Sequence, residues 1–318
     1  MTLRRLSVAA VVVTYLHLVF GGIVRISGSG MGCGDHWPMC NGRWFPDFTN
    51  AIIAIEWTHR LLATLVILTI AMLALVAYRR RAETGVGGPA GVLHAATTAL
   101  MLVIAVALLG MLTVKLGNRP IATVAHWTLA LALLGVVLAT AVRAGALGGE
   151  SALVHGGTPR AARSLGAGAV LAFIAVVLGG LVAKFPDAAI ACTSFPLCGD
   201  VPATVAKGAS HLQMTHRVIA YLLFFHVLGI GMAIGRRGGE APVVKRTARA
   251  AMLLVLIQVG LGAAMVLSML PPALRSLHQA VGILVWMALF LATYLARVAS
   301  ASAIVVADVA RQPLREGA

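Results

Sequence analysis

Eight long apolar segments dominate this chain of 318 residues. A helix needs about 20 apolar residues to cross a hydrocarbon core of about 30 Å, because its backbone polar groups must be satisfied within the segment. Since 60% of the residues are hydrophobic and 11% are charged, a water-soluble domain could not bury this much apolar surface. We predict an all-α integral membrane protein whose eight transmembrane helices cover residues 6–26, 55–78, 91–114, 121–143, 164–183, 211–235, 246–270 and 275–298.

The net charge of +15 does not indicate a nucleic acid partner, because the Lys and Arg residues lie in short loops and form no continuous stripe. Membrane lipids are the expected surroundings. If both termini are cytoplasmic, 16 of the 25 basic residues, Arg315 among them, lie on the cytoplasmic side, as the positive-inside rule requires. The first segment begins like a signal peptide but lacks a small-residue cleavage site, so we expect it to remain as the first helix.

The four cysteines form two closely spaced pairs in loops that the charge pattern places outside the cell. The pairs are Cys33 with Cys40 and Cys192 with Cys198. Disulfides persist in such an oxidising environment, and we predict one in each loop. A zinc site would more often show C-x-x-C spacing with histidine partners, and covalent haem attachment would need C-x-x-C-H.

One unit of four helices is used twice along the chain. Three features recur in the same order in the two halves: a glycine pair at 21–22 and 179–180, the triplet THR at 58–60 and 215–217, and a histidine at 126 and 278. Because four crossings is an even number, both copies enter from the same side, which predicts two tandem parallel four-helix bundles. The predicted units are residues 1–145 and 164–300, with a cytoplasmic linker at 146–163 and a cytoplasmic tail at 301–318.

Four histidines lie near the outer ends of the even-numbered segments: His59, His126, His216 and His278. Each copy therefore offers two imidazoles at a similar depth, which is the usual way in which a four-helix bundle holds a haem iron. Zinc would require three or four ligands per site, and a proton relay would place its ionisable side chains at successive depths along the membrane normal. The other six histidines, His17 among them, have no histidine at the matching position, and we interpret them as packing or hydrogen-bonding residues.

The two copies differ in one carboxylate. Glu56 precedes His59 by three residues on the same helix face, whereas Gln213 holds the matching position in the second copy. A carboxylate in an apolar region is costly, which favours a functional role, although an ion pair with Arg60 is the alternative. Because Arg217 keeps the arginine in the second copy without the acid, we predict that the first copy is reactive and the second transfers electrons.

Three arginines near the outer helix ends, Arg25, Arg60 and Arg217, are candidate partners for haem propionates, because the guanidinium fork suits carboxylates. Ordinary snorkelling to the membrane interface is the alternative. Two glycines in the odd-numbered segments, Gly110 and Gly262, either admit a haem or a backbone closely or serve helix packing.

The stretch VRISGSGMGCGDHWPMCNGRWFP at 24–46, then EWTHR at 56–60, the later histidines and the second cysteine pair together resemble the eight-helix haem A synthases of aerobic bacteria. The resemblance covers about residues 6 to 298. It implies an oxidoreductase of the bacterial plasma membrane that converts the C8 methyl group of haem O, via a hydroxylated intermediate, to the formyl group of haem A for terminal oxidases.

The resemblance also implies a role for each candidate residue. His59 and His126 would be the axial ligands of the substrate haem O, and Glu56 would act at its reacting methyl group. His216 and His278 would ligate the iron of a haem b cofactor that passes electrons.

The outer loops and the partners follow from the same resemblance. The disulfide Cys33–Cys40 would support the substrate half, with the second cysteine pair as its counterpart. A haem O synthase and terminal oxidase assembly factors are expected partners, and the chain could form an oligomer. One departure concerns the third segment, where relatives often carry glutamine four residues before the glycine: this chain has Val106 there, although the seventh segment has Gln258.

Two other functions would use the same four histidines. A dihaem electron-transfer cytochrome would carry electrons without altering a haem, and it gives no reason for an acid in only one copy. A haem transporter or chaperone would bind haem reversibly and form no product.

Overall fold

The structure is a computed structural model that describes residues 2–199, 205 and 207–311. Eight of the helices in this part of the chain are long and apolar enough to cross a membrane, which confirms the predicted all-α membrane architecture. The helices are α1 (Leu3–Ile26), α2 (Ala51–Arg79), α3 (Val92–Lys115), α4 (Pro120–Arg143), α5 (Gly149–Val154), α6 (Pro159–Lys184), α7 (Lys207–Arg236), α8 (Pro242–Leu267) and α9 (Pro272–Arg311).

Several helices begin before the apolar run that predicts them. Helix α2 begins four residues earlier than expected, because the side chain of Asn50 caps it by accepting a hydrogen bond of 2.9 Å from the backbone N–H of Ile52. Proline opens α6 and α8, at Pro159 and Pro242, where its fixed φ and missing N–H are tolerated. Apolar length thus locates the spans, whereas local capping chemistry sets where the helices begin.

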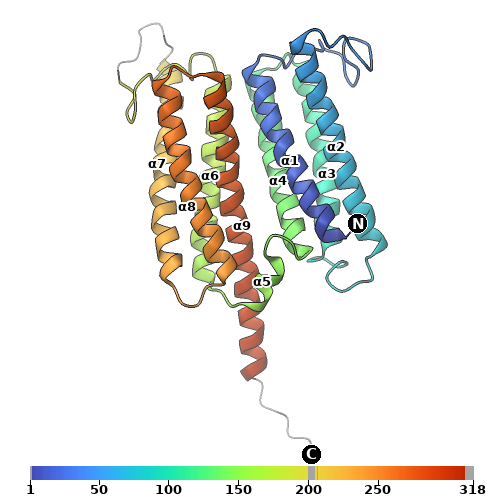
Figure 1. The fold of residues 1–318 in the computed structure, drawn as a ribbon, viewed down its shortest axis with the longest axis vertical. Helices are drawn as coiled ribbons and strands as arrows, with labels where there is room; N and C mark the ends of the chain where they lie inside the picture. Colours follow the sequence, from blue (N-terminus) through green and yellow to red (C-terminus); the bar gives the residue numbers. More distant parts are fainter. Residues whose placement is uncertain (1, 200–204, 206, 312–318) are drawn as a thin grey trace, which may run out of the picture.

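Figure 1 shows α1 to α4 side by side in one bundle and α6 to α9 in another, with the N-terminus and α5 toward the same end of the molecule. This arrangement is compatible with the predicted tandem repeat. The two bundles meet along α1, α4, α6 and α9, since α9 packs on α1 and α4 as well as on its own neighbours. Fully buried Leu131 and Leu134 of α4 and Ile283 and Leu289 of α9 belong to one apolar core at this boundary.

The predicted linker at 146–163 contains the short helix α5, which has too few residues to show a pattern of its own. Glu240, in the turn between α7 and α8, accepts hydrogen bonds from the backbone N–H and the hydroxyl of Thr158, directly before α6. The last helix continues through Arg311, so the described part of the predicted tail is helical. Arg315 lies outside the described residues.

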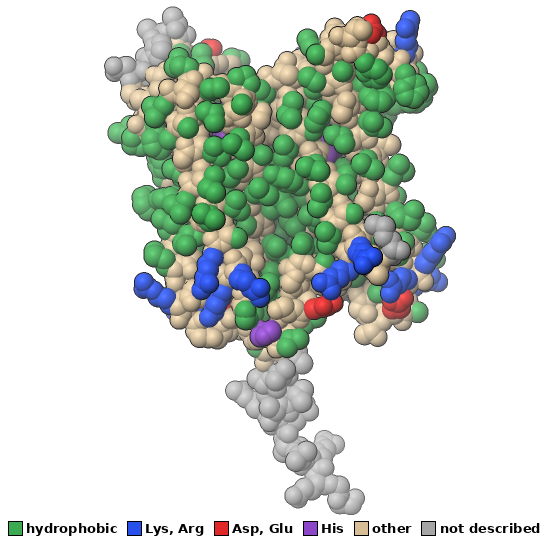
Figure 2. All heavy atoms as spheres, in the orientation of Figure 1, with side chains coloured by type: hydrophobic (Ala, Val, Ile, Leu, Met, Phe, Trp, Pro, Cys, Tyr) green, Lys and Arg blue, Asp and Glu red, His purple; other side chains and the backbone are tan. Residues whose placement is uncertain are grey.

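Lys and Arg side chains gather at the end of the molecule where the N-terminus lies, while the middle of the visible face is largely hydrophobic (Figure 2). We call this the basic end. The opposite end carries the loops at 27–50 and 185–199, each with one cysteine pair, and we call it the disulfide end (Figure 1). Such an asymmetry of basic residues is what the positive-inside rule describes.

Candidate functional site

A cavity of about 1050 Å³ lies between the two bundles and reaches into both. Residues from all eight long helices line it, and most of them are apolar. The cavity brings together the four histidines that the sequence singles out, His59, His126, His216 and His278, with Glu56 on its wall. Its volume is at the upper limit of the roughly 300–1,000 Å³ that ordinary ligand pockets occupy.

Each of these four imidazoles packs against a glycine of the neighbouring helix. A Cβ atom added to the glycine would lie only about 3 Å from the Cε1 atom of the ring, so a larger residue would displace the imidazole. The pairs and distances are Gly21 with His59 at 3.3 Å, Gly110 with His126 at 2.9 Å, Gly179 with His216 at 3.1 Å, and Gly262 with His278 at 3.2 Å. Gly110 and Gly262 thus make room for the histidine rings.

Two of the four rings are anchored by a backbone carbonyl on the neighbouring helix. The Nδ1 atom of His126 lies 3.0 Å from the carbonyl oxygen of Val106, and that of His216 lies 3.0 Å from the carbonyl oxygen of Ala175. An imidazole that donates from Nδ1 keeps the lone pair of Nε2 for a metal, and a hydrogen bond of this kind fixes the ring of most metal-binding histidines. One histidine in each half therefore has surroundings that are typical of a metal-binding histidine.

The other two rings face polar side chains instead. The Nε2 atom of His278 lies 3.2 Å from the amide nitrogen of Gln258, and the ring centroid of His59 lies 4.3 Å from that of His17. Both His59 and His278 keep a buried Nδ1 atom that has no hydrogen-bond partner among the described residues. Since buried polar atoms are nearly always paired, these orphaned nitrogens fit a site whose ligand sets the final ring orientation.

His17 belongs to the site, which sequence reasoning missed because it asked only for histidines with a repeated partner. Its ring lines the cavity beside His59, and its Nε2 atom is buried without a partner among the described residues. A signal was present in the sequence: His17 precedes Gly21 by four residues, the same spacing at which Gln258 precedes Gly262.

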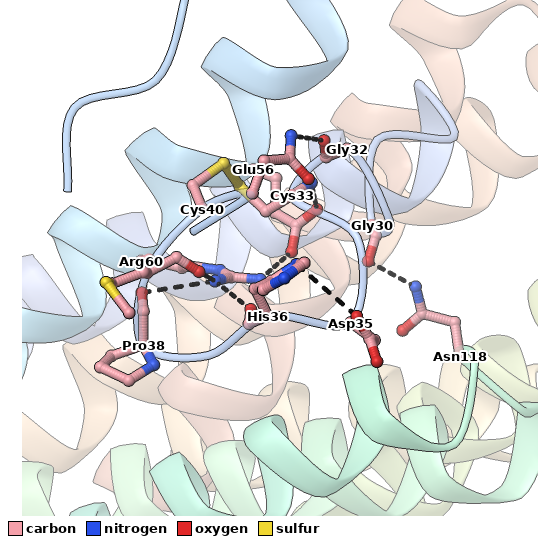
Figure 3. A network of polar contacts seen from close by, with 12 residues as sticks. Gly30, Gly32, Cys33, Asp35, His36, Pro38, Cys40, Glu56, Arg60 and Asn118 are labelled. Atoms are coloured by element: carbon pink, nitrogen blue, oxygen red, sulfur yellow. Dashed lines mark hydrogen bonds and ion pairs between the residues drawn. A yellow bond between two sulfur atoms is a disulfide. The ribbon is translucent and has the colours of Figure 1, made fainter. Parts of the chain in front are cut away.

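Two of the three candidate propionate arginines bind the disulfide loops. The Nη1 atom of Arg60 donates to the carbonyl oxygens of His36 at 2.8 Å and Met39 at 2.9 Å (Figure 3). Arg217 makes the same kind of contact in the second half, where its Nη1 atom donates to the carbonyl oxygen of Ser194 at 2.7 Å. The arginine of the repeated THR triplet therefore holds the loop of its own half against the helix.

Glu56 is 3% exposed and uses both carboxylate oxygens. Its Oε1 atom accepts from the Nη2 atom of Arg60 at 2.5 Å, and its Oε2 atom accepts from the backbone N–H of Cys33 at 2.9 Å (Figure 3). The ion pair that the sequence offered as the alternative interpretation is thus formed, and it is joined to the disulfide loop. The matching Gln213 keeps its Oε1 atom buried without a partner among the described residues.

Both cysteine pairs lie at disulfide distance, as predicted. The Cα atoms are 4.4 Å apart in Cys33–Cys40 and 4.5 Å apart in Cys192–Cys198. The loop that contains Cys33 and Cys40 has a further contact: the amide of Asn118 donates to the carbonyl oxygen of Gly30 at 2.6 Å (Figure 3). The loop is therefore held both by α2 and by the turn between α3 and α4.

The two halves also insert side chains into each other. Trp127, which follows His126, lies over Gly180, where an added Cβ atom would be 2.9 Å from the indole ring. Gln279, which follows His278, lies over Gly22 in the reverse direction. In each repeated glycine pair the first glycine accommodates a histidine of its own half and the second accommodates a side chain from the other half.

Comparison with known proteins identifies relatives along most of the chain. Residues 4–290 match the family COX15-CtaA, described as cytochrome oxidase assembly protein. Relatives include the heme A synthase of Geobacillus kaustophilus, 27% identical over 265 residues that cover 80% of this chain and 78% of the relative. The heme A synthase of Bacillus pumilus is 31% identical over 70% of this chain and 71% of its own length, and that of Geobacillus thermodenitrificans is 25% identical over 94% of both.

Removing the Arg217 guanidinium should release the second disulfide loop. We expect Arg217→Met to make this loop roughly tenfold more susceptible to limited proteolysis, because a tenfold change corresponds to about 1.4 kcal/mol and several hydrogen bonds from a cation are lost. The control is Arg119→Met, at an exposed arginine of the same end. Equal cleavage rates in the two variants would mean that Arg217 does not hold the loop.

Proposed function

This chain belongs to the cytochrome oxidase assembly protein family COX15-CtaA, and we propose that it is a haem A synthase. In the proposed reaction the C8 methyl group of haem O and one water give a hydroxymethyl group, two protons and two electrons, and the hydroxymethyl group then loses two more protons and two more electrons to become the formyl group of haem A. The electrons would leave one at a time through the second haem to an external electron acceptor. The observation that carries this proposal is that one cavity is lined by two related histidine pairs and that, among the described residues, the carboxylate in its lining, that of Glu56, lies beside the first pair.

The residues of the cavity fit two haems. In this proposal His59 and His126 bind the iron of the substrate, while His216 and His278 hold a haem b, which supplies one-electron transfer. The glycines that leave room for the rings, the anchored Nδ1 atoms and the orphaned buried nitrogens all support these assignments. In the substrate half, the ring of His17 lies beside that of His59. The matching residue of the other half is the small Ala175.

Glu56 is the residue that we propose acts at the reacting methyl group. Its contacts with Arg60 and with the backbone of Cys33 fix the carboxylate at the cavity wall. A carboxylate held there can stabilise the positive charge that develops on the methyl carbon during oxidation, or accept a proton from an attacking water. The amide of Gln213 can do neither well, which fits an electron-transfer role for the second half.

The same proposal places the molecule in a bacterial plasma membrane with the basic end in the cytoplasm and the disulfide end outside. The gathering of Lys and Arg side chains at the basic end supports this orientation (Figure 2). A haem O synthase that delivers the substrate and assembly factors of a terminal oxidase that receive the product are the proposed partners.

Extraction of haems from cells that lack this protein tests the function most directly. The cells should accumulate haem O and lose haem A, and a plasmid copy of the chain should restore haem A. A dihaem electron-transfer cytochrome or a haem transporter would leave the conversion intact, so normal haem A in the deletion strain would overturn the proposal.

Glu56→Gln should keep haem binding and abolish the reaction. We expect haem A yield to fall by about 10² or more, because an amide cannot act as a general base and such groups contribute roughly 10²–10⁴. The matched control is Glu83→Gln, the same change at an exposed glutamate outside the cavity lining, which should leave the yield unchanged. Haem content and haem A yield would be measured on the same preparations, and an undiminished yield from Glu56→Gln would rule out its catalytic role.

His278→Ala should remove the haem b. We expect the haem content per purified chain to fall by one equivalent, because His216 alone would hold the iron far more weakly than the proposed pair of histidines. The control is His94→Ala, at an exposed histidine on α3 outside the cavity lining. The content would be measured as the pyridine haemochrome, and an unchanged stoichiometry would contradict the assignment of this ligand.

A further inference from the structure

Three cations lie together at the boundary between the two halves, at the disulfide end of the cavity. Arg25 is at the end of α1, Lys184 at the end of α6 and Arg275 in the first turn of α9, and all three line the cavity. Arg25 lies within electrostatic range of both other cations. None of the three forms an ion pair with an acidic side chain of the described residues.

These cations differ from Arg60 and Arg217, the other two cations among the described residues that line the cavity. Arg60 and Arg217 donate hydrogen bonds to carbonyl oxygens of the disulfide loops. The Nη1 atom of Arg25, by contrast, is buried and has no partner among the described residues. Three like charges facing a mostly apolar cavity repel one another, and a partly buried charge without a counter-ion is unfavourable. The arrangement therefore favours an anionic ligand.

The orientation of Arg25 is set by the other half of the molecule. Its Nη2 atom donates to the Oε1 atom of Gln279 at 2.9 Å, and the amide nitrogen of Gln279 donates to the carbonyl oxygen of Leu18 at 3.4 Å. A Cβ atom at Gly22 would lie 2.0 Å from that nitrogen, so only glycine leaves room for the amide. Gln279 directly follows His278, which links one ligand of the second half to the guanidinium of the first.

We propose that Arg25, Lys184 and Arg275 form a carboxylate-binding site shared by the two halves, and that Gln279 is its positioning residue. The ligand is the carboxylate edge of a bound porphyrin, that is, its propionate groups. Arginine forks bind carboxylates in two-point contacts, and the cluster opens into the same cavity as the four histidines. This inference rests on the proposed function, since it takes a haem as the ligand.

The test compares two probes that share an iron and a ring but differ in charge. The purified full-length chain in detergent is titrated with protohaem and with protohaem dimethyl ester, and binding is followed by absorbance. We expect the diacid to bind at least about tenfold more tightly than the ester, because charge-assisted hydrogen bonds are lost in the ester. The ratio of the two dissociation constants isolates the contribution of the carboxylates from that of the iron ligands.

The variants remove either the positioning or the charge. Gln279→Leu and Gly22→Ala leave every cation in place but displace the amide from Arg25, and Arg25→Gln removes the charge itself. In all three we expect the ratio to fall toward one. Lys115→Gln and Arg119→Gln change exposed cations of the same end and should keep the wild-type ratio. If a variant does not fold, Lys184→Gln and Arg275→Gln at the helix ends test the same prediction.

A wild-type ratio near one would overturn the inference, as would an unchanged ratio in the folded variants. A third arm adds phosphatidylglycerol: if this lipid abolishes the ratio, the cluster binds a lipid phosphate and the proposed ligand is wrong. The proposed function fails separately, in the haem extraction from the deletion strain. If the cells produce haem A but the ratio of the two dissociation constants is one, the carboxylate site alone is refuted. If neither protohaem nor its dimethyl ester binds, both the carboxylate site and the proposed haem-binding function are refuted.

Discussion

The contact between an imidazole and a glycine of the next helix is the feature on which the rest of the cavity depends. In a span without water a histidine must find its room and its partner inside the protein. A glycine lets the two helices approach while the ring still fits, and a Cβ atom at Gly110 would lie 2.9 Å from His126. This contact occurs four times, twice in each bundle, and all four rings line the one cavity that the eight long helices enclose.

The disulfide loops depend on the helices below them as much as on their own cysteines. Arg60 and Arg217 bind loop carbonyls in the same manner, so this part of the design is common to both halves. Among the described residues an acid joins the network in the first half alone, where Glu56 contacts the loop backbone at Cys33. The carboxylate proposed to act in the reaction is therefore positioned by the loop that closes its bundle, and a displaced loop would also displace the acid.

The sequence predicted the features that follow from length, period and repetition. The eight spans, the two cysteine pairs and the four histidines could be found because each depends on residue type and spacing alone. The site residue His17 was missed, and so was the contact of Gln279 with Arg25, because both arise where helices distant in sequence meet. Arg60 illustrates the same limit: its spacing from Glu56 suggested the ion pair, whereas its hydrogen bonds to the loop required the folded chain.

The residues four positions before the four glycines show how the copies have diverged. In the first half these are His17 and Val106, and in the second half Ala175 and Gln258. At the small or apolar residue of each half, Val106 or Ala175, the backbone carbonyl anchors the histidine ring. At the polar residue, His17 or Gln258, the side chain contacts the histidine ring instead.

The ring that a carbonyl anchors is on α4 in the first half but on α7 in the second, and these two helices do not hold equivalent positions in the repeat. Both halves thus keep two histidines while the groups behind the rings differ, and such groups set the basicity and orientation of an imidazole. Two sites with the same histidines can therefore differ in chemistry, as the proposed function requires of them.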